Sequence, residues 1–406
     1  MKKRGVTIVL CLALVLFSIL RAYAEVEVPA AATAETAESV QNQIVPAGVE
    51  EFDVPCAAAI LIDEDSGTVL YEKNADGQRP IASITKVMIL LLTFQALESG
   101  KISVDDFVPI SEHAYSMGGS QIWLEPGEQM TLGDMLKAIC VSSANDAAVA
   151  VAEYVGGSEP AFVQMMNEMA EQLGMTNTHF ENACGLDQEG HLSSARDVAT
   201  MSREMLLHHT EVRDYCSIWT DTLRDGATQL VNTNNLLKSY SGITGLKTGT
   251  TSKAGVCISA SAERDGLRLI AVVLGSASGK ERFEAATTLL DYGFANYENI
   301  TAELPSDAPQ SLPVVRGTSE LVSLQYDTPQ KCLMPKGQVE TLDVTVELPE
   351  KLEAPVAAGT QVGTVHLKNG DTELQTFSIM AAEDVSALSF GYCFGRLLHS
   401  LALCSV

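Results

Sequence analysis

The sequence of 406 residues predicts a mixed α/β protein, on the basis of two β-hairpins, several apolar helices and a β-rich final third. The hairpins combine alternating strands with short polar turns, at 57–63 with 68–73 and at 255–262 with 267–275. Apolar stretches between them have the length and composition of buried helices, namely 87–92, 132–141 and 147–155. This mixture of antiparallel hairpins and helices indicates the α/β (α+β) class.

The first 24 residues have the pattern of a secretory signal peptide. Lys2, Lys3 and Arg4 precede an apolar core, and Ala22-Tyr23-Ala24 is an A-x-A cleavage site. An uncleaved anchor helix is the alternative, which the short core disfavours. Residues 25–50 are rich in Ala, Glu, Thr and Val without periodicity and are expected to form a solvated spacer.

The overall charge is strongly acidic. Removal of the signal takes away four of the 26 basic residues and none of the 52 acidic ones, which leaves 22 against 52, or −30. Such a charge argues against nucleic acid as a partner. The sequence contains no metal-binding or phosphate-binding motif, so we expect no cofactor and no metal.

The cysteines are scattered through apolar stretches without C-x-x-C or metal-ligand spacing. We interpret six of them as small buried hydrophobic residues, with disulfides as the alternative: Cys56, Cys140, Cys184, Cys216, Cys257 and Cys332.

The stretch Ser83-Ile84-Thr85-Lys86 is the first candidate catalytic motif. On a helix, positions i and i+3 share a face, so Lys86 is expected within hydrogen-bond reach of Ser83. The apolar residues that follow predict burial, which disfavours the charged form of a lysine and lowers its pKa. A neutral amine beside a hydroxyl can activate it as a nucleophile. A Ser-x-x-Lys alone also occurs by chance.

Ser143-Ala144-Asn145 is the second motif, just before an apolar helix. The hydroxyl can relay a proton and the amide can bind a peptide group. The alternative is helix capping, for which Ser and Asn are favoured.

Lys247-Thr248-Gly249 is the third motif and opens the second hairpin region. On an edge strand, Lys247 and Thr248 would present a cation and a hydroxyl to a cleft, while Gly249 would let a ligand backbone approach. The alternative is an ordinary exposed strand start.

In this order and at this spacing, the three motifs resemble the signature of penicillin-recognising serine enzymes. Residues 51–297 are similar to the low-molecular-mass penicillin-binding proteins, the serine-type D-Ala-D-Ala carboxypeptidases, and also share the segments 116–120 and 185–187. The resemblance implies a central antiparallel sheet and a helical part with a cleft between them.

The resemblance also implies roles for individual residues. Ser83 would be acylated, Lys86 would accept its proton, and Ser143 would belong to the proton relay. Substrate binding is expected from six positions: Asn145, Lys247, Thr248, Gly249, Thr250 and Arg282. The backbone N–H groups of Ser83 and Thr250 would form the oxyanion hole. For Arg282, the alternative is a surface residue paired with Glu281 or Glu284.

Two positions depart from the family pattern. A segment often written Asn-Pro-His-Gly-Leu-Asp is Asn182-Ala183-Cys184-Gly185-Leu186-Asp187 here, so no catalytic histidine is expected at Cys184. Some relatives carry a cleft arginine where this chain has Thr233, so one contact to a substrate carboxylate is expected to be missing.

The chain beyond residue 297 has a different composition. Prolines mark a linker, after which short alternating runs predict a small β-sandwich over 298–384, including a hairpin around Asn369-Gly370-Asp371. The tail, 385–406, is predicted to be an amphipathic helix whose stripe is Phe390, Phe394, Leu397, Leu401 and Cys404. Arg396 would fall near mid-membrane in a spanning helix, so contact with the outer face of the cytoplasmic membrane is favoured over spanning. Packing on the chain's own sandwich is the alternative.

The resemblance implies an exported D-Ala-D-Ala carboxypeptidase that trims peptidoglycan stem peptides and is inhibited covalently by β-lactams. A β-lactamase is the second possibility and needs a carboxylate-activated water, for which only Glu181 and Glu189 are candidates. A non-catalytic penicillin-binding receptor is the third, and the intact Ser83 and Lys86 argue against it.

Overall fold

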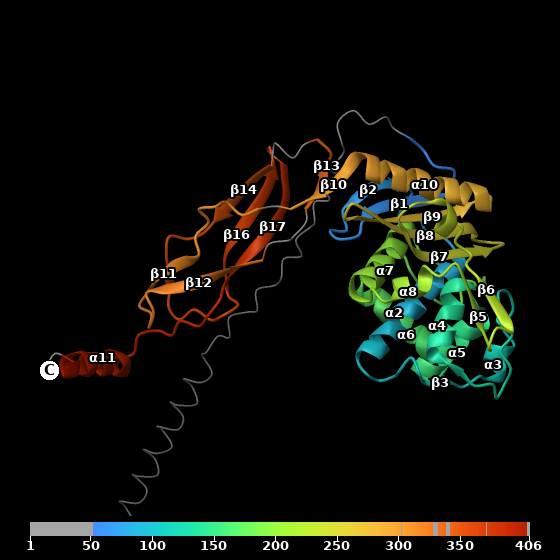
Figure 1. The fold of residues 1–406 in the computed structure, drawn as a ribbon, viewed down its shortest axis with the longest axis horizontal. Helices are drawn as coiled ribbons and strands as arrows, with labels where there is room; N and C mark the ends of the chain where they lie inside the picture. Colours follow the sequence, from blue (N-terminus) through green and yellow to red (C-terminus); the bar gives the residue numbers. More distant parts are fainter. Residues whose placement is uncertain (1–51, 302, 328–331, 338–341, 371, 404–406) are drawn as a thin grey trace, which may run out of the picture. The chain divides into compact units, whose positions relative to one another are not determined.

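The computed structural model describes most of the chain: residues 52–301, 303–327, 332–337, 342–370 and 372–403. The predicted signal peptide (1–24) and spacer (25–50) lie outside these residues, as does Cys404. The described segments are drawn as coloured ribbons in Figure 1.

A five-stranded antiparallel sheet lies at the centre of the first part, with strand order β2-β1-β9-β8-β7. Its strands are β1 (Ala58–Asp63), β2 (Val69–Lys73), β7 (Ile243–Thr251), β8 (Gly255–Arg264) and β9 (Leu267–Ser276). Both predicted hairpins are confirmed, as β1–β2 and β8–β9. The strand that carries Lys247-Thr248-Gly249 is an edge strand, as predicted.

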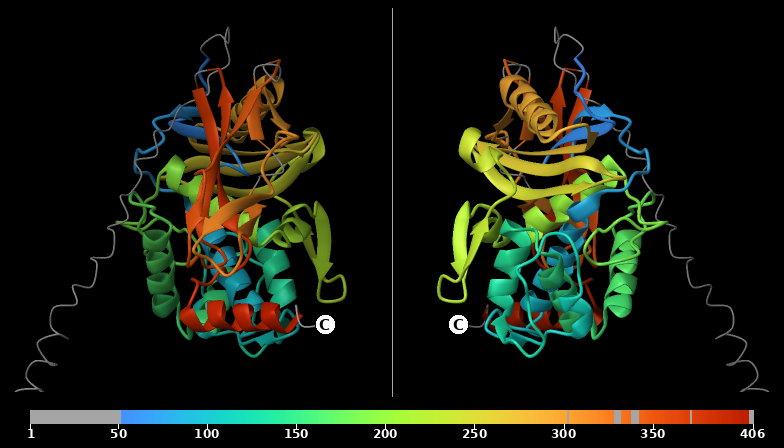
Figure 2. Two further views of the ribbon diagram at one scale, coloured as in Figure 1. Left: turned by 90° about the vertical axis from the view of Figure 1, so that its left-hand side faces the viewer. Right: turned by 90° about the vertical axis from the view of Figure 1, so that its right-hand side faces the viewer.

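Both faces of this sheet are buried, which explains why its inner strands β1 and β9 are apolar at nearly every position. Side chains alternate between the faces of a strand, so in β1 Ile60 enters one core and Leu61 the other. One face packs on α10 (Gly279–Asn296) and the opposite face on the helical part (Figures 1 and 2).

Most helices belong to the helical part: α2 (Lys86–Glu98), α3 (Glu112–Tyr115), α4 (Leu132–Val141), α5 (Asn145–Gly156), α6 (Glu159–Gln172), α7 (Ala195–His208) and α8 (Val212–Cys216). The short α9 (Leu236–Ser239) instead contributes Leu236 to the core on the α10 side of the sheet. Two small antiparallel strand pairs accompany these helices: β3 (Phe107–Val108) with β4 (Met130–Thr131), and β5 (Thr220–Leu223) with β6 (Thr228–Val231). Thr131 caps α4 by accepting from the Asp134 N–H, as its sequence position predicts. Gly100, just after α2, has the left-handed φ of +69° that ends many helices.

The local structure at Ser83 differs from the prediction. Ser83 lies in a 3₁₀ turn, η1 (Ala82–Thr85), and α2 begins only at Lys86. A 3₁₀ turn also places residues i and i+3 one above the other, so the predicted pairing of Ser83 with Lys86 survives the change.

The last third of the chain is β-rich, as predicted. Over the described residues, six of its strands are joined by hydrogen bonds in the order β14-β16-β17-β12-β11-β15, and they enclose a common buried core. These strands are β11 (Ser311–Val315), β12 (Leu321–Tyr326), β14 (Leu342–Glu347), β15 (Leu352–Glu353), β16 (Gln361–Asn369) and β17 (Thr372–Ala381). The predicted hairpin is β16–β17. Two further strands, β10 (Tyr297–Ile300) and β13 (Cys332–Pro335), pair with each other.

The tail contains a helix, α11 (Phe390–Leu403), as predicted. Within the described parts of the chain, no helix has both the length and the apolarity needed to span a membrane. Of the six cysteines interpreted as buried, five are buried and Cys56 is only half-buried.

Candidate active site

The nucleophile candidate Ser83 lies on a tightly constrained turn. The preceding Ala82 has φ +50°, a left-handed conformation that is uncommon for a residue with a side chain. Two glycines press on this turn from outside: a Cβ on Gly249 would lie 2.8 Å from the Ser83 nitrogen, and one on Gly185 only 2.0 Å from the Ala82 carbonyl oxygen. These close approaches hold the turn in its strained form.

Lys86 lies directly beneath Ser83 and is completely buried. Its Nζ is 2.9 Å from Ser83 Oγ, 2.6 Å from Asn145 Oδ1 and 2.7 Å from the Cys184 carbonyl oxygen. Burial lowers the pKa of Lys86 to about 8. A neutral amine in this position can donate its two protons to Asn145 and Cys184 and direct its lone pair at Ser83.

The second motif reaches the same point from the start of α5. Asn145 is the first residue of this helix, and its Nδ2 donates to the Gly118 carbonyl at 2.7 Å. Ser143 is buried and has φ +60°. Among the described residues, the Ser143 hydroxyl makes no hydrogen bond, so the structure does not join it directly to Ser83 or Lys86. The alternative of helix capping is wrong, because Ala144 is the N-cap and neither polar side chain caps α5.

Lys247 of the third motif is also buried, with 1% of its surface exposed, so it is no ordinary strand start. Its Nζ donates to the Thr248 carbonyl at 3.0 Å. Burial, and then the nearby charge of Lys86, lower the pKa of Lys247 to about 7. The Thr248 hydroxyl lies 2.6 Å from that of Thr233, which places Thr233 beside the third motif.

The structure shows a reason for glycine at position 249 that the sequence did not indicate. The Ser83 turn of the protein itself approaches Gly249 too closely for a side chain. The next residue, Thr250, is exposed, and its hydroxyl donates to the Gly249 carbonyl at 2.8 Å.

Arg282 lies in the first turn of α10 and is 7% exposed. It is not the surface residue of the alternative interpretation, because it has no ion pair with Glu281 or Glu284. A guanidinium N–H donates to the Cys257 carbonyl at 3.3 Å, opposite Gly249 in the β7–β8 register, and Nε has no partner among the residues that the structure describes. Burial lowers the pKa of Arg282 to about 10. No hydrogen bond joins it to Lys247 or Thr250.

A loop that sequence reasoning used only for the resemblance completes the site. Cys184 contributes its backbone carbonyl to Lys86, while burial raises the pKa of its thiol. Asp187 on the same loop accepts from the Thr251 and Ser252 hydroxyls at 2.5 and 3.0 Å, which ties the loop to the end of β7. A carbonyl contact has no signature in the sequence, since every residue has a carbonyl.

His191 is a further residue that the sequence did not single out. Its Nδ1 accepts from the Glu181 N–H at 3.1 Å, so Nε2 carries the proton and donates to Thr85 Oγ1 at 2.8 Å. Thr85 in turn donates to the Ala82 carbonyl. Burial lowers the pKa of His191 to about 4.

The family model described as D-alanyl-D-alanine carboxypeptidase matches residues 45–278, more than half of the chain. The chain belongs to this family. A second model, described as the C-terminal domain of penicillin-binding protein 5, matches residues 303–387.

The similarity to individual relatives covers most of this chain. D-alanyl-D-alanine carboxypeptidase DacF of Bacillus subtilis is 41% identical over 337 residues, or 82% of this chain and 86% of the relative. The crystal structure of penicillin-binding protein 5 from Haemophilus influenzae is 31% identical and superposes with a TM-score of 0.76, covering 84% of this chain and all of that one. Penicillin-binding protein D2 of Listeria monocytogenes, solved in a cefotaxime-bound form, is 33% identical with a TM-score of 0.56, covering 61% of this chain and all of its own.

The protein is therefore a serine-type D-Ala-D-Ala carboxypeptidase of the low-molecular-mass penicillin-binding class, with a C-terminal β-rich domain.

Proposed function

We propose that the carboxypeptidase acts through an acyl-enzyme on Ser83, with Lys86 as the general base. The observation that carries this proposal is the contact of 2.9 Å between Ser83 Oγ and a buried amine whose pKa is lowered to about 8. A pKa near the working pH gives a group that can both accept and return a proton.

The proposed reaction has two stages. Ser83 Oγ attacks the carbonyl carbon of the penultimate D-Ala while Lys86 takes the hydroxyl proton. The C–N bond to the terminal D-Ala then breaks, the leaving amine takes up a proton, and an ester on Ser83 remains. Water attacks this ester in the second stage and releases the shortened peptide.

The other motif residues would bind and orient the substrate. The backbone N–H groups of Ser83 and Thr250 are the proposed oxyanion hole, since such donors contribute ~3–4 kcal/mol in other acyl-transfer enzymes. Lys247, Thr248 and Arg282 are the proposed partners of the terminal carboxylate. Asn145 and Gly249 would support the site through contacts inside the protein. Asn145 accepts a hydrogen bond from Lys86 and so orients it, and Gly249 leaves room for the Ser83 turn.

Ser143 is proposed to relay a proton to the leaving amine once substrate is bound. Its hydroxyl has no hydrogen-bond partner among the described residues, so it is available to a ligand. The left-handed backbone at Ser143 is consistent with this role, because strained conformations are often retained at functional sites.

The natural substrates in this proposal are peptidoglycan stem peptides that end in D-Ala-D-Ala, whose trimming limits cross-linking. We also propose that penicillins acylate Ser83 and remain attached, because the opened ring cannot leave; the cefotaxime-bound relative supports this. The enzyme would be exported by its signal peptide (1–24). The proposed division of the remaining chain is spacer 25–50, catalytic domain 51–297, β-rich domain 298–384 and membrane-associating tail 385–406.

The β-lactamase alternative lacks support at the two candidate carboxylates. Glu181 contacts His179 at 3.2 Å and Gln188 at 3.5 Å, and neither Glu181 nor Glu189 touches Ser83 or Lys86 in the described structure. A receptor without catalysis would not need a buried lysine against the serine.

Mass spectrometry of a D-Ala-D-Ala pentapeptide incubated with the protein tests the proposal. We expect the loss of one D-Ala with wild type and none with Ser83→Ala. Turnover by Ser83→Ala at the wild-type rate would contradict it.

A further inference from the structure

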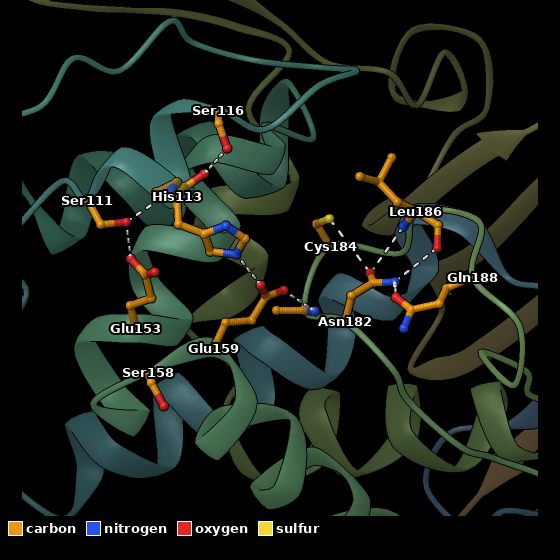
Figure 3. A network of polar contacts seen from close by, with 12 residues as sticks. Ser111, His113, Ser116, Glu153, Ser158, Glu159, Asn182, Cys184, Leu186 and Gln188 are labelled. Carbon is orange, nitrogen blue, oxygen red and sulfur yellow. Dashed lines mark hydrogen bonds and ion pairs between the residues drawn. The ribbon is translucent and has the colours of Figure 1, made fainter.

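The position of Lys86 depends on a carbonyl in the middle of a loop, which is anchored on one side by the Glu181 N–H to His191 and on the other by Asp187 to the end of β7. Cys184 lies in the segment 182–186, and its carbonyl is one of the two acceptors that leave the Lys86 lone pair facing Ser83. Within the segment, Asn182 Oδ1 accepts from the Gly185 and Leu186 N–H groups at 2.8 and 3.2 Å (Figure 3). These bonds shape the loop but do not attach it to the rest of the protein.

Glu159 supplies such an attachment. Its Oε1 accepts from the Ala183 N–H at 2.9 Å, one residue before the Cys184 carbonyl (Figure 3). Glu159 opens α6, where the helix dipole favours a negative charge, and its side chain is 13% exposed. The Ala183 N–H is thus bound by a residue at the start of a helix, which is held more firmly than a residue in another loop would be.

The second oxygen of Glu159 reaches the opposite wall of the site. His113 Nε2 lies 2.5 Å from Glu159 Oε2 and belongs to α3, just before the segment 116–120 (Figure 3). Gly118 in that segment accepts from Asn145 Nδ2, and Asn145 is the other acceptor of Lys86. One carboxylate therefore contacts the residue next to Cys184 directly and, through His113, the short helix that leads to Gly118.

We propose that Glu159 is a positioning residue for the acylation step. Through Ala183 and His113 it holds the Cys184 carbonyl and Asn145 where they direct the Lys86 lone pair at Ser83. This inference rests on the proposed role of Lys86 as the base. Glu159 makes no hydrogen bond to Ser83 or Lys86, so its proposed effect is indirect. That effect requires a hydrogen-bond acceptor for the Ala183 N–H rather than a charge.

The test compares two nearly isosteric variants of the full-length protein. Glu159→Met removes the acceptor, whereas Glu159→Gln keeps an oxygen for the Ala183 N–H. Glu153→Met is the matched control, because Glu153 accepts from the Ser111 hydroxyl in the same network but has no bond to the 182–186 segment (Figure 3). The readouts are the second-order rate of Ser83 labelling by fluorescent penicillin and the melting temperature of each protein. If Glu159→Met gives no melting transition, Glu159→Ala takes its place.

We expect Glu159→Met to slow labelling by about ten- to a hundredfold, as a small misplacement of catalytic groups does. Glu159→Gln and Glu153→Met should stay within about threefold of wild type, even where their melting temperatures fall. Labelling of Glu159→Met at the wild-type rate would overturn the inference, as would equal slowing in Glu159→Gln or in Glu153→Met. Wild type that is not labelled at Ser83 would instead contradict the proposed acyl-enzyme.

Discussion

At the scale of single residues, the site is built on two buried lysines. Lys86 and Lys247 have almost no exposed surface, and each is kept from its ordinary pKa mainly by burial. A buried cation without a carboxylate partner opposes folding. The fold tolerates this cost at the point where the proposed mechanism places a neutral amine and a carboxylate-binding cation, and such shifted pKa values are typical of active sites.

Lys247→Met should therefore stabilise the protein while lowering its turnover. The pKa of Lys247 is about 7 in the folded protein and 10.5 ordinarily, so the unfolded chain binds the extra proton between these values. Stability from this group rises with pH over that range, and its penalty is complete below pH ~7. Thermal unfolding should show Lys247→Met melting above wild type at about pH 6, with a smaller gap at about pH 9. A lower melting temperature for the variant at the acidic pH would contradict this account.

Arg282→Ala should lower kcat/KM for a peptide with a free terminal carboxylate by about ten- to a hundredfold, because hydrogen bonds to charged groups contribute ~1.5–3 kcal/mol. Lys280→Ala is the matched control, since Lys280 lies on the same turn of α10 and its side chain is 83% exposed. Steady-state kinetics on the acid peptide measures both. Unchanged kinetics of Arg282→Ala would remove this residue from the substrate-binding set.

At the scale of elements, the decisive junction is where the edge strand β7 meets the η1 turn. The strand approaches so closely at Gly249 that a Cβ would lie 2.8 Å from the Ser83 nitrogen and 3.0 Å from the Ile81 carbonyl oxygen. Both neighbours are backbone atoms, which cannot rotate away as a side chain can. The close approach of Ser83 to the third motif thus depends on the absence of a side chain at Gly249.

Gly249→Ala should push β7 away from η1 and slow the acylation of Ser83 by at least about a hundredfold. Gly279→Ala serves as the comparison, because a Cβ there meets nothing within 4 Å. The rate of penicillin labelling reports on both. A Gly249→Ala protein that is labelled as fast as Gly279→Ala would show that the junction is not restrictive.

Local signals made much of this architecture predictable from sequence. The turn 64–67 and the helix cap Thr131 are each determined by a few adjacent residues, and the hairpin and the helix that they predicted are present. The 3₁₀ turn at Ser83 was predicted as α-helix, because the glycines that constrain it, Gly185 and Gly249, are distant in sequence. The three motifs were predictable because each is a short local pattern. The contact of the Cys184 carbonyl with Lys86 and the contact of Glu159 with Ala183 were not, because they join residues that are distant in sequence or involve a backbone group.

At the scale of the whole molecule, the two family models match the catalytic and the β-rich segments in turn, at 45–278 and 303–387. The tail follows the second match. Three members of its predicted stripe are largely uncovered in the structure: Phe390 is 85% exposed, Phe394 50% and Leu397 57%. An exposed apolar stripe on a helix at the chain end is a candidate membrane contact.

Deletion of residues 385–406 should therefore abolish binding of the protein to lipid vesicles, with little effect on acylation in solution. Co-sedimentation with vesicles is the measurement. Phe394→Asp within the full chain is a second probe, because it places a charge on the stripe while keeping the helix length. Identical partitioning of the shortened and full-length proteins would leave the tail without this role.

Ser83 is the proposed site of acylation, and Lys86 is the proposed base that activates it. Intact-mass spectrometry after incubation with penicillin, followed by peptide mapping, tests both roles most directly. We expect one adduct per wild-type chain on the peptide that contains Ser83, no adduct on Ser83→Ala, and nearly as complete a loss for Lys86→Ala, since nucleophile and base act as a unit. An adduct that persists in Ser83→Ala, or that maps to Ser142 or Ser143, would contradict the account.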